Sequence, residues 1–428
     1  MELADIFAEY ASSVTFSDLS DQVVHEVKRR VLDSLAVAYA SKSSPPALVV
    51  RDVLPQFPGN GLLLGGGNAS PDISSFYNTL LIRYLDFNDT YLSLEPLHPS
   101  DMIGGVLAVN PRLNGKELIR SIALGYEVST RLCDSTSLRK KGYDHVNFLE
   151  VGATVAIGSA LGLSSEQMRN AISISLVPHV ALRETRSGSL SMWKAGAAGE
   201  AVRNSAFACI LAKSGFTGPR TPFSGKMGFT RIVAPDMSFS PFEKMGTDKI
   251  MSTYIKKYPV EYHAQAAVEA SLKLKERIKG EIKKVTVETY EAGVTILADE
   301  GKWDPKNKET ADHSLPFIVS VSLLTGNFWL NSYDLIGNQK VLDLMKQVEV
   351  VENENFTKVY PEELPTKIVV STKDGTYEEE VRVPRGHFKN PMSDRELEEK
   401  ALRLGLSRTQ IEKIWSLENL EGKDIVTW

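Results

Sequence analysis

Apolar residues recur every three or four positions through the first half of the chain, the spacing of a helix with one buried face. Three stripes show this best: Val24, Val27, Val31 and Leu35; Ile73, Tyr77, Leu81 and Tyr84; and the run from Leu118 to Arg131. Small residues crowd positions 195–201 (AGAAGEA), so we expect a helix there that approaches a neighbour closely. The first half therefore predicts a large all-helical domain.

The pattern changes after about Pro235. Val285, Val287 and Thr289 alternate with polar residues, as in a half-buried strand. Further on, Asp374-Gly375 separates two runs rich in β-forming residues, which predicts a hairpin. Helical segments lie between these strands, so this region predicts a smaller α+β domain.

Helical spacing returns near the C-terminus. Two capping boxes, Ser393 with Glu396 and Ser407 with Gln410, mark the expected helix starts. We predict a helical domain over residues 1–240, an α+β domain over 241–390, and C-terminal helices over 391–428 that return to the helical domain. The fold class is thus mainly α with an α+β part.

Composition and charge argue against several classes of binding partner. The 428 residues carry a net charge of −5 without a long basic run, which argues against nucleic acid as a partner. The only cysteines, Cys133 and Cys209, lie in apolar contexts and are expected to be buried thiols. No apolar run is long enough for a membrane helix, and the N-terminus lacks the features of a signal peptide. We expect a cytoplasmic protein that does not bind membranes.

The stretch from Arg83 to Asn110 holds the densest candidate chemistry. Asp86, Asp89 and Thr90 have the spacing that places side chains on one face of a helical turn. His98 precedes Pro99-Ser100-Asp101, which read as the first turn of a new helix. Carboxylates and a histidine near a helix start suit proton transfer on a carboxylate substrate.

Other candidates lie further along the chain. His145 is in GYDHVNFLE, just before a helix, and is open to a catalytic or a merely structural role. Lys194 falls in the first turns of the small-residue helix, where a cation opposes the helix dipole. It is either a solvated lysine or a ligand for a substrate carboxylate. Lys256 and Lys257 precede Tyr258-Pro259 and are open to the same two interpretations.

The sequence lacks the motifs of several common kinds of metal, phosphate-binding and nucleophilic site. The histidines and cysteines do not show HxH, HExxH or zinc-type spacing. The glycines in LGGGNAS are not followed by the Lys-Ser/Thr of a phosphate loop, so we expect a turn. A GxSxG nucleophile elbow is also missing.

Six segments together resemble the MmgE/PrpD family, in that family's order and over almost the whole chain. They are LDFNDTYLSLEPLHPSD, GYEVSTRL, SMWKAGAAGEAVRN, KYPVEYHAQAAVEA, ETADHSLPF and NPMSDREL. The resemblance implies a helical domain built from both chain ends, a smaller α+β lid domain that closes over it, and an active site between them. It also implies a homodimer that needs neither a metal nor another cofactor.

The resemblance also implies roles for individual residues. The matching motifs assign catalysis to Asp86, His98 and His145, and substrate binding to Thr90, Lys194 and Lys256. Lys256 is favoured over its neighbour Lys257. Which of the three catalytic candidates acts as base and which as acid stays open.

The best-known members of this family are 2-methylcitrate dehydratases, and cis-aconitate decarboxylase is a relative. The first hypothesis is therefore a metal-independent hydro-lyase that dehydrates 2-methylcitrate or citrate, with a small tricarboxylate as its partner. The second is decarboxylation of cis-aconitate or isomerisation of a related acid. The third, from another class, is a non-catalytic helical dimer that serves as a binding module.

Overall fold

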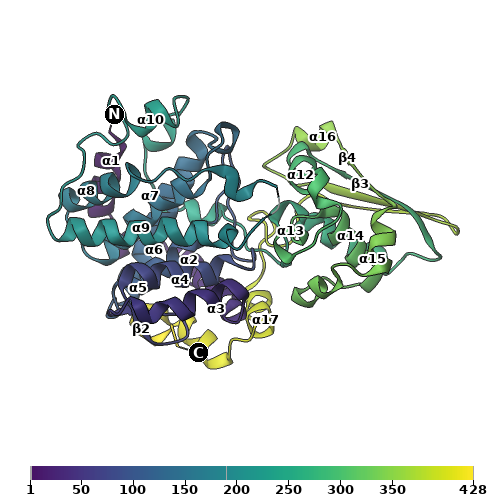
Figure 1. Ribbon diagram of the computed structural model, residues 1–428, viewed down its shortest axis with the longest axis horizontal. Coiled ribbons are helices and arrows are strands. Elements are labelled where there is room, and N and C mark those ends of the chain that lie inside the picture. The colour runs from purple at the N-terminus through teal and green to yellow at the C-terminus, as the bar shows by residue number, and fades with distance from the viewer. Residues whose placement is uncertain (1, 189, 428) are drawn as a thin grey trace. The chain divides into compact units, whose positions relative to one another are not determined.

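The computed structural model describes residues 2–188 and 190–427. Its contacts divide the chain into two compact units. The first contains Met1–Ser187, Met192–Thr253 and Ser393–Trp428, and the second contains Gly188–Ser191 and Tyr254–Met392. The first unit is helical and draws on both ends of the chain, whereas the second is α+β (Figure 1). The predicted fold class is confirmed.

Helices form almost all of the regular structure of the first unit. They are α1 (Leu3–Ser13), α2 (Asp21–Ser41), α3 (Pro45–Val53), α4 (Pro71–Arg83), α5 (Ile103–Val109), α6 (Gly115–Ser135), α7 (Val146–Ala160), α8 (Ser165–Leu176), α9 (Trp193–Lys213), α10 (Phe229–Ile232), α17 (Asp394–Leu404) and α18 (Arg408–Trp415). The strands β1 (Gly61–Leu62) and β2 (Asn68–Ala69) form a short antiparallel pair. The turn between them contains the glycines of LGGGNAS, as expected.

Small residues let the central helices pack closely. The small-residue prediction is confirmed, because α9 packs along α4 and α7. A Cβ at Gly199 of α9 would lie 3.0 Å from the carbonyl oxygen of Phe76 in α4. Between α6 and α7, a Cβ at Gly152 would lie 2.8 Å from the carbonyl oxygen of Gly125. Larger side chains at these crossings would push the helices apart and move the residues at their ends.

The second unit is built around a four-stranded sheet with the order β4-β3-β5-β6. Its strands are β3 (Ile282–Thr289), β4 (Val348–Glu352), β5 (Thr366–Thr372) and β6 (Thr376–Val381). Its helices are α11 (Gln265–Lys275), α12 (Glu291–Leu297), α13 (Lys308–Ala311), α14 (Leu315–Thr325), α15 (Gln339–Met345) and α16 (Glu354–Thr357). β3 pairs parallel with β4 and antiparallel with β5. The predicted hairpin is confirmed, since β5 and β6 are antiparallel neighbours joined at Asp374-Gly375.

The C-terminal segment returns to the first unit and holds an internal loop in place. Both predicted capping boxes are present, at the starts of α17 and α18. In Figure 1 the yellow α17 lies against the helices of the N-terminal part of the chain, and its contacts are with α2. Lys400 of α17 forms a buried ion pair with Asp33 of α2 at 2.6 Å. The same Nζ donates a hydrogen bond to the Phe87 carbonyl oxygen at 3.0 Å.

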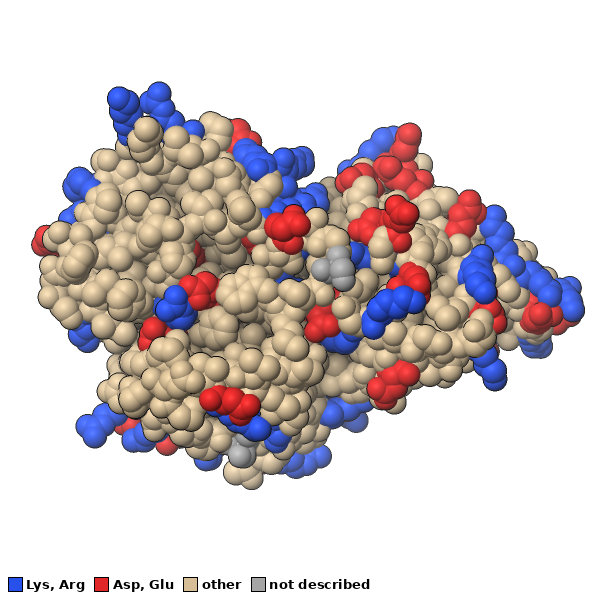
Figure 2. All heavy atoms as spheres, viewed as in Figure 1, with Lys and Arg blue, Asp and Glu red and all other residues tan. Residues whose placement is uncertain are grey.

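The helical unit keeps many of its charges inside. In Figure 2 most of the face of this unit is tan, and the charged side chains on it stand singly or in small groups. By contrast, its interior holds Arg30, Asp33, Asp89, Asp101 and Lys400 at less than a tenth of full exposure. Buried ions need partners, so their pairing constrains the path of the chain.

Two further observations concern the cysteines and the length and polarity of the helices. Cys133 and Cys209 are free and buried, as predicted. Within residues 2–188 and 190–427, every helix is too short or too polar to cross a bilayer.

Lys400→Met should destabilise the helical unit by about 3–5 kcal/mol, because Asp33 would stay buried without its cation. Urea unfolding followed by circular dichroism measures this change. Arg395→Met is the matched control on the same helix, since its side chain is 88% exposed and pairs only at the surface with Glu399. Equal stability of the two variants would show that the Lys400 pair contributes little.

Candidate active site

The loop after α4 departs from the helical turn that the spacing of its polar residues predicted. α4 ends at Arg83, and the chain turns at Asp86, whose φ is +52°. The expected common face of Asp86, Asp89 and Thr90 is therefore wrong. An i, i+3, i+4 spacing brings side chains together only on a helix, and this segment is irregular.

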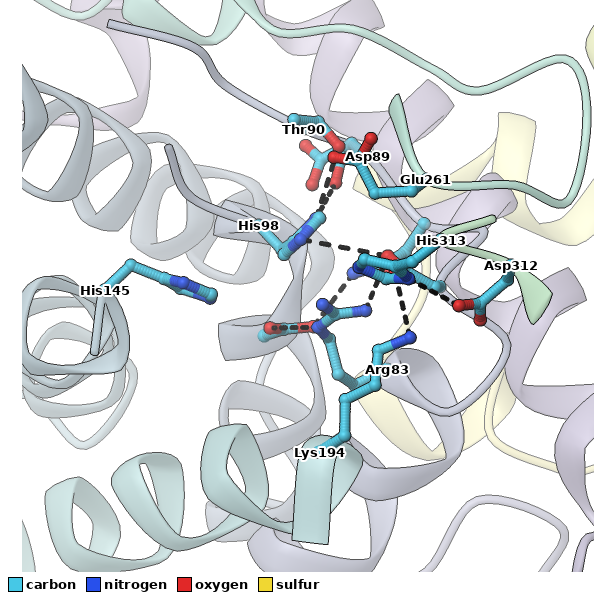
Figure 3. Close-up of polar contacts among 12 residues, drawn as sticks. Arg83, Asp89, Thr90, His98, His145, Lys194, Glu261, Asp312 and His313 are labelled. Carbon is cyan, nitrogen blue, oxygen red and sulfur yellow. Dashed lines mark hydrogen bonds and ion pairs between the residues drawn. The ribbon is translucent and has the colours of Figure 1, made fainter. Parts of the chain in front are cut away.

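Asp86 lies at the centre of a buried charge cluster. Its Oδ1 accepts a hydrogen bond from Arg83 Nη1 at 2.7 Å, and its Oδ2 lies 3.2 Å from Lys194 Nζ. The Nε2 atom of His98 lies 3.8 Å from Oδ1. Figure 3 shows the side chains of Arg83, His98 and Lys194 converging from three segments. Lys194 is thus a buried counter-ion, and its interpretation as a solvated lysine is wrong.

The backbone of Asp86 is itself unusual. Among the described residues it is the only non-glycine with a positive φ. Such a conformation costs on the order of 1–3 kcal/mol, and strain of this kind clusters at functional sites. Here the two cations hold the carboxylate in place, which offsets the cost of the backbone.

His98 is oriented by the loop that precedes it. Its Nδ1 lies 2.8 Å from the Asp89 carbonyl oxygen and 3.2 Å from the Thr90 hydroxyl. A carbonyl oxygen can only accept a hydrogen bond, so Nδ1 carries a proton. The other ring nitrogen, Nε2, faces the Asp86 carboxylate. Thr90 therefore supports the histidine, which is a different contact from the substrate binding expected of it.

His145 immediately precedes α7 and faces His98. The two ring centroids are 5.6 Å apart with an interplanar angle of 68°, and Figure 3 shows the His145 ring pointing toward His98. Nδ1 lies 3.1 Å from Oδ1 of Asp144. Burial lowers the pKa of His145 to about 3 and outweighs the opposing effect of Asp144. The imidazole is therefore neutral near pH 7 and can accept a proton.

Asp89 has a structural role in the loop. It is fully buried, and its carboxylate accepts hydrogen bonds from the Tyr126 hydroxyl at 2.7 Å and the Ser100 backbone N–H at 3.0 Å. Arg30 Nε of α2 lies 3.5 Å away. These partners come from α2, α6 and the turn after His98, so Asp89 ties the loop to two helices.

Three site residues of the helical unit did not emerge from the sequence patterns. Arg83 holds Asp86, Asp144 contacts the ring of His145, and Arg186 lies 3.1 Å from Asp144. Asp144 stands next to His145 in the sequence, which is a usable signal. Arg83 and Arg186 have ordinary sequence contexts, so only the tertiary structure identifies them.

The predicted residues divide between the two units. Asp86, Thr90, His98, His145 and Lys194 all belong to the helical unit, and the structure brings them together there. Lys256 belongs to the α+β unit, where it is fully buried, whereas its neighbour Lys257 is half-buried. The cluster in the helical unit combines a carboxylate, two histidines and two cations, which suits proton transfer beside an anionic substrate.

The lowered pKa of His145 predicts the pH range over which its ring stays neutral. Its ring should stay neutral from pH 8 down to pH 5, as measured by the ¹⁵N and ¹³C shifts of labelled histidine and assigned with His145→Gln. The unfolded chain takes up this proton near pH 6.5, so His145 contributes stability above that pH. That contribution is lost as the pH falls toward 3. A titration midpoint between 6 and 7 would contradict the burial argument.

Comparison with known proteins shows the family to which this chain belongs. Sequence profiles of the MmgE/PrpD N-terminal and C-terminal domains match residues 5–241 and 258–417. A 2-methylcitrate dehydratase of Escherichia coli strain K12 is 30% identical over 350 residues, covering 74% of this chain and 71% of the relative. One from Cupriavidus necator is 27% identical, covering 89% and 86%. The fungal alkylcitrate dehydratase phiI is 27% identical, covering 92% and 87%. With both domain profiles matched in order, this chain belongs to the MmgE/PrpD family.

Proposed function

We propose that this chain is a carbon–oxygen lyase that dehydrates 2-methylcitrate, or citrate, to the corresponding cis-aconitate. The single observation that carries this proposal is the cluster in which His98 and Lys194 each lie within 4 Å of the Asp86 carboxylate and the His145 ring faces His98. Relatives named 2-methylcitrate dehydratase cover most of the chain and support the choice of substrate.

The reaction removes a proton next to a carboxylate and a hydroxyl from the neighbouring carbon. A base takes the proton, the electron pair forms the C=C bond, and the hydroxyl leaves as water after it has received a proton. Asp86, His98 and His145 are the groups proposed for these transfers. Each positioned acid or base typically contributes about 10²–10⁴-fold to the rate.

The cations of the cluster have a separate task. Removing a proton beside a carboxylate places extra negative charge on that carboxylate. Fixed cations stabilise this charge strongly in a site that excludes water. We propose that Lys194, with its charge held at the cluster by Asp86, binds a substrate carboxylate. Lys256 is proposed as a second carboxylate ligand, and Thr90 as a further contact.

We also propose that the protein is a homodimer in the cytoplasm and needs neither a metal nor another cofactor. The family resemblance supports the homodimer, and the two free, buried cysteines suit a reducing compartment such as the cytoplasm. The absence of metal-type spacing in the sequence supports the last statement. The partner proposed for this protein is its substrate, a small tricarboxylate.

An absorbance assay for the new conjugated C=C bond tests the function directly. The purified protein is incubated with 2-methylcitrate, citrate or isocitrate, with and without a strong chelator. We expect dehydration of 2-methylcitrate that the chelator leaves unchanged. Release of CO₂ from cis-aconitate would indicate a decarboxylase instead. Lack of turnover on every tricarboxylate would favour a binding protein.

His98→Asn should lower kcat by about 10²-fold or more while KM changes little, because the loss falls on the chemical step. Steady-state kinetics on 2-methylcitrate measures both values. His25→Asn is the matched control, since this histidine lies at the surface and pairs with Asp394. If only KM rose in His98→Asn, the ring would position the substrate and the proton transfer would belong to other groups.

The two adjacent lysines allow a matched test of carboxylate binding. Lys256→Met should lower kcat/KM by about tenfold or more, since a hydrogen bond to a charged group is worth about 1.5–3 kcal/mol. Lys257→Met should stay close to the parent protein. Melting temperatures of both variants serve as the folding control. The reverse order of the two effects would assign the substrate contact to Lys257.

A further inference from the structure

A chain of contacts in the helical unit leads from Arg186 to the ring of His145. Arg186, in the short 3₁₀ turn Arg183–Arg186, donates from Nε to Oδ2 of Asp144 at 3.1 Å. The other oxygen, Oδ1, accepts the Val146 backbone N–H at 3.3 Å and lies 3.1 Å from His145 Nδ1. Both oxygens of this buried carboxylate are thus occupied by fixed donors.

This arrangement decides which nitrogen of His145 carries the proton. An ionised carboxylate only accepts hydrogen bonds, so the Nδ1 atom beside it must carry the hydrogen. In the neutral ring the lone pair is then on Nε2. That Nε2 atom is buried and has no hydrogen-bond partner among the described residues. A lone pair without a partner is the group that a general base requires.

Asp144 is held rigidly by its neighbours. Its backbone N–H donates to the Ala181 carbonyl oxygen at 3.0 Å. The Asn147 side chain donates to the Asp144 carbonyl oxygen at 2.7 Å and accepts the Ala181 N–H at 2.8 Å. Although burial opposes ionisation, the nearby Arg186 and His145 bring the pKa of Asp144 below its ordinary value. The carboxylate is therefore both fixed and charged.

Arg186 also connects this carboxylate with the other side of the cluster. Its Nη1 donates to the Lys194 carbonyl oxygen at 2.8 Å, in the first turn of α9. One planar guanidinium therefore sets the position of Asp144 and of the backbone that carries Lys194. Lysine could not replace it, since an ammonium group lacks the planar fork that spans two acceptors.

We propose that Asp144 and Arg186 are positioning residues that present Nε2 of His145 as the base of the dehydration. The proposal rests on the function proposed above. The substrate C–H bond breaks, its proton passes to Nε2, and its electron pair forms the C=C bond as the C–O bond breaks. The leaving hydroxyl takes a proton from His98, which lies beside the Asp86 carboxylate as a protonated ring would require. Asp144 stabilises the His145 imidazolium until its proton returns to solvent.

The tautomer of His145 is the first test, and it needs neither a variant nor substrate. The ¹⁵N spectrum of the whole unliganded protein should show a protonated Nδ1 and an unprotonated Nε2 for this ring. A protonated Nε2 would overturn the proposal. This measurement is independent of turnover, so it separates the orientation of His145 from the identity of the reaction.

Kinetics of Asp144→Asn and Arg186→Lys supply the second test. We expect kcat for 2-methylcitrate to fall by about 10²-fold in Asp144→Asn, because the amide no longer enforces one tautomer. Arg186→Lys should lower kcat by about tenfold and change the pH dependence of kcat. Arg183→Lys, on the same turn, is the matched control. Parent-like kcat and pH profiles in both variants would overturn the proposal.

The outcomes also separate failure of this inference from failure of the proposed function. If the parent protein dehydrates neither 2-methylcitrate nor citrate, the proposed function is wrong and the proposal of a positioned base falls with it, whatever the tautomer. If the parent protein is active and Asp144→Asn does not fold, Arg186→Lys and the tautomer of the parent protein decide the matter.

Discussion

Compensation of buried charge in the helical unit sets the path of the loop between α4 and α5. Asp89 has to reach Arg30 and Tyr126, and the carbonyl oxygen of Phe87 accepts a hydrogen bond from Lys400. Leaving one of these ions without a partner would cost several kcal/mol. The loop therefore has little freedom, although it is irregular. This constraint fixes the positions of Asp86 and His98, which are two of the groups proposed to transfer protons.

Compensation of buried charge also distinguishes supporting groups from the groups that are proposed to react. Asp89 and Asp144 are both buried carboxylates, and each has donors on its two oxygens. Asp86 instead lies between cations in a strained backbone conformation, and His145 has a ring nitrogen with no hydrogen-bond partner among the described residues. Fully satisfied groups fix geometry, whereas strained or unsatisfied groups are available to a substrate. Buried ion pairs therefore hold in place the few groups that are proposed to react.

Close packing of small residues is the second condition for bringing the site residues together. Lys194 reaches Asp86 because α9 lies close to α4, and this approach depends on residues such as Gly199. The C-terminal helix α17 adds Lys400 from a distant part of the sequence. The site thus depends on contacts between segments that are far apart along the chain. A change in any of these packing contacts would shift the backbone and so displace the groups that are proposed to react.

Patterns in the sequence were sufficient for the helices, the β5–β6 hairpin and the capping boxes. These features depend on local spacing, turn chemistry and helix starts, which neighbouring residues determine. The motifs also named Asp86, His98, His145 and Lys194 as a group, through their resemblance to a family. The expected helical turn at Asp86–Thr90 was wrong, because spacing cannot show that buried partners pull a segment out of helical geometry. The roles of Arg83 and Arg186 were likewise decided only by the tertiary structure, since an ion pair between distant residues leaves no periodic trace in the sequence.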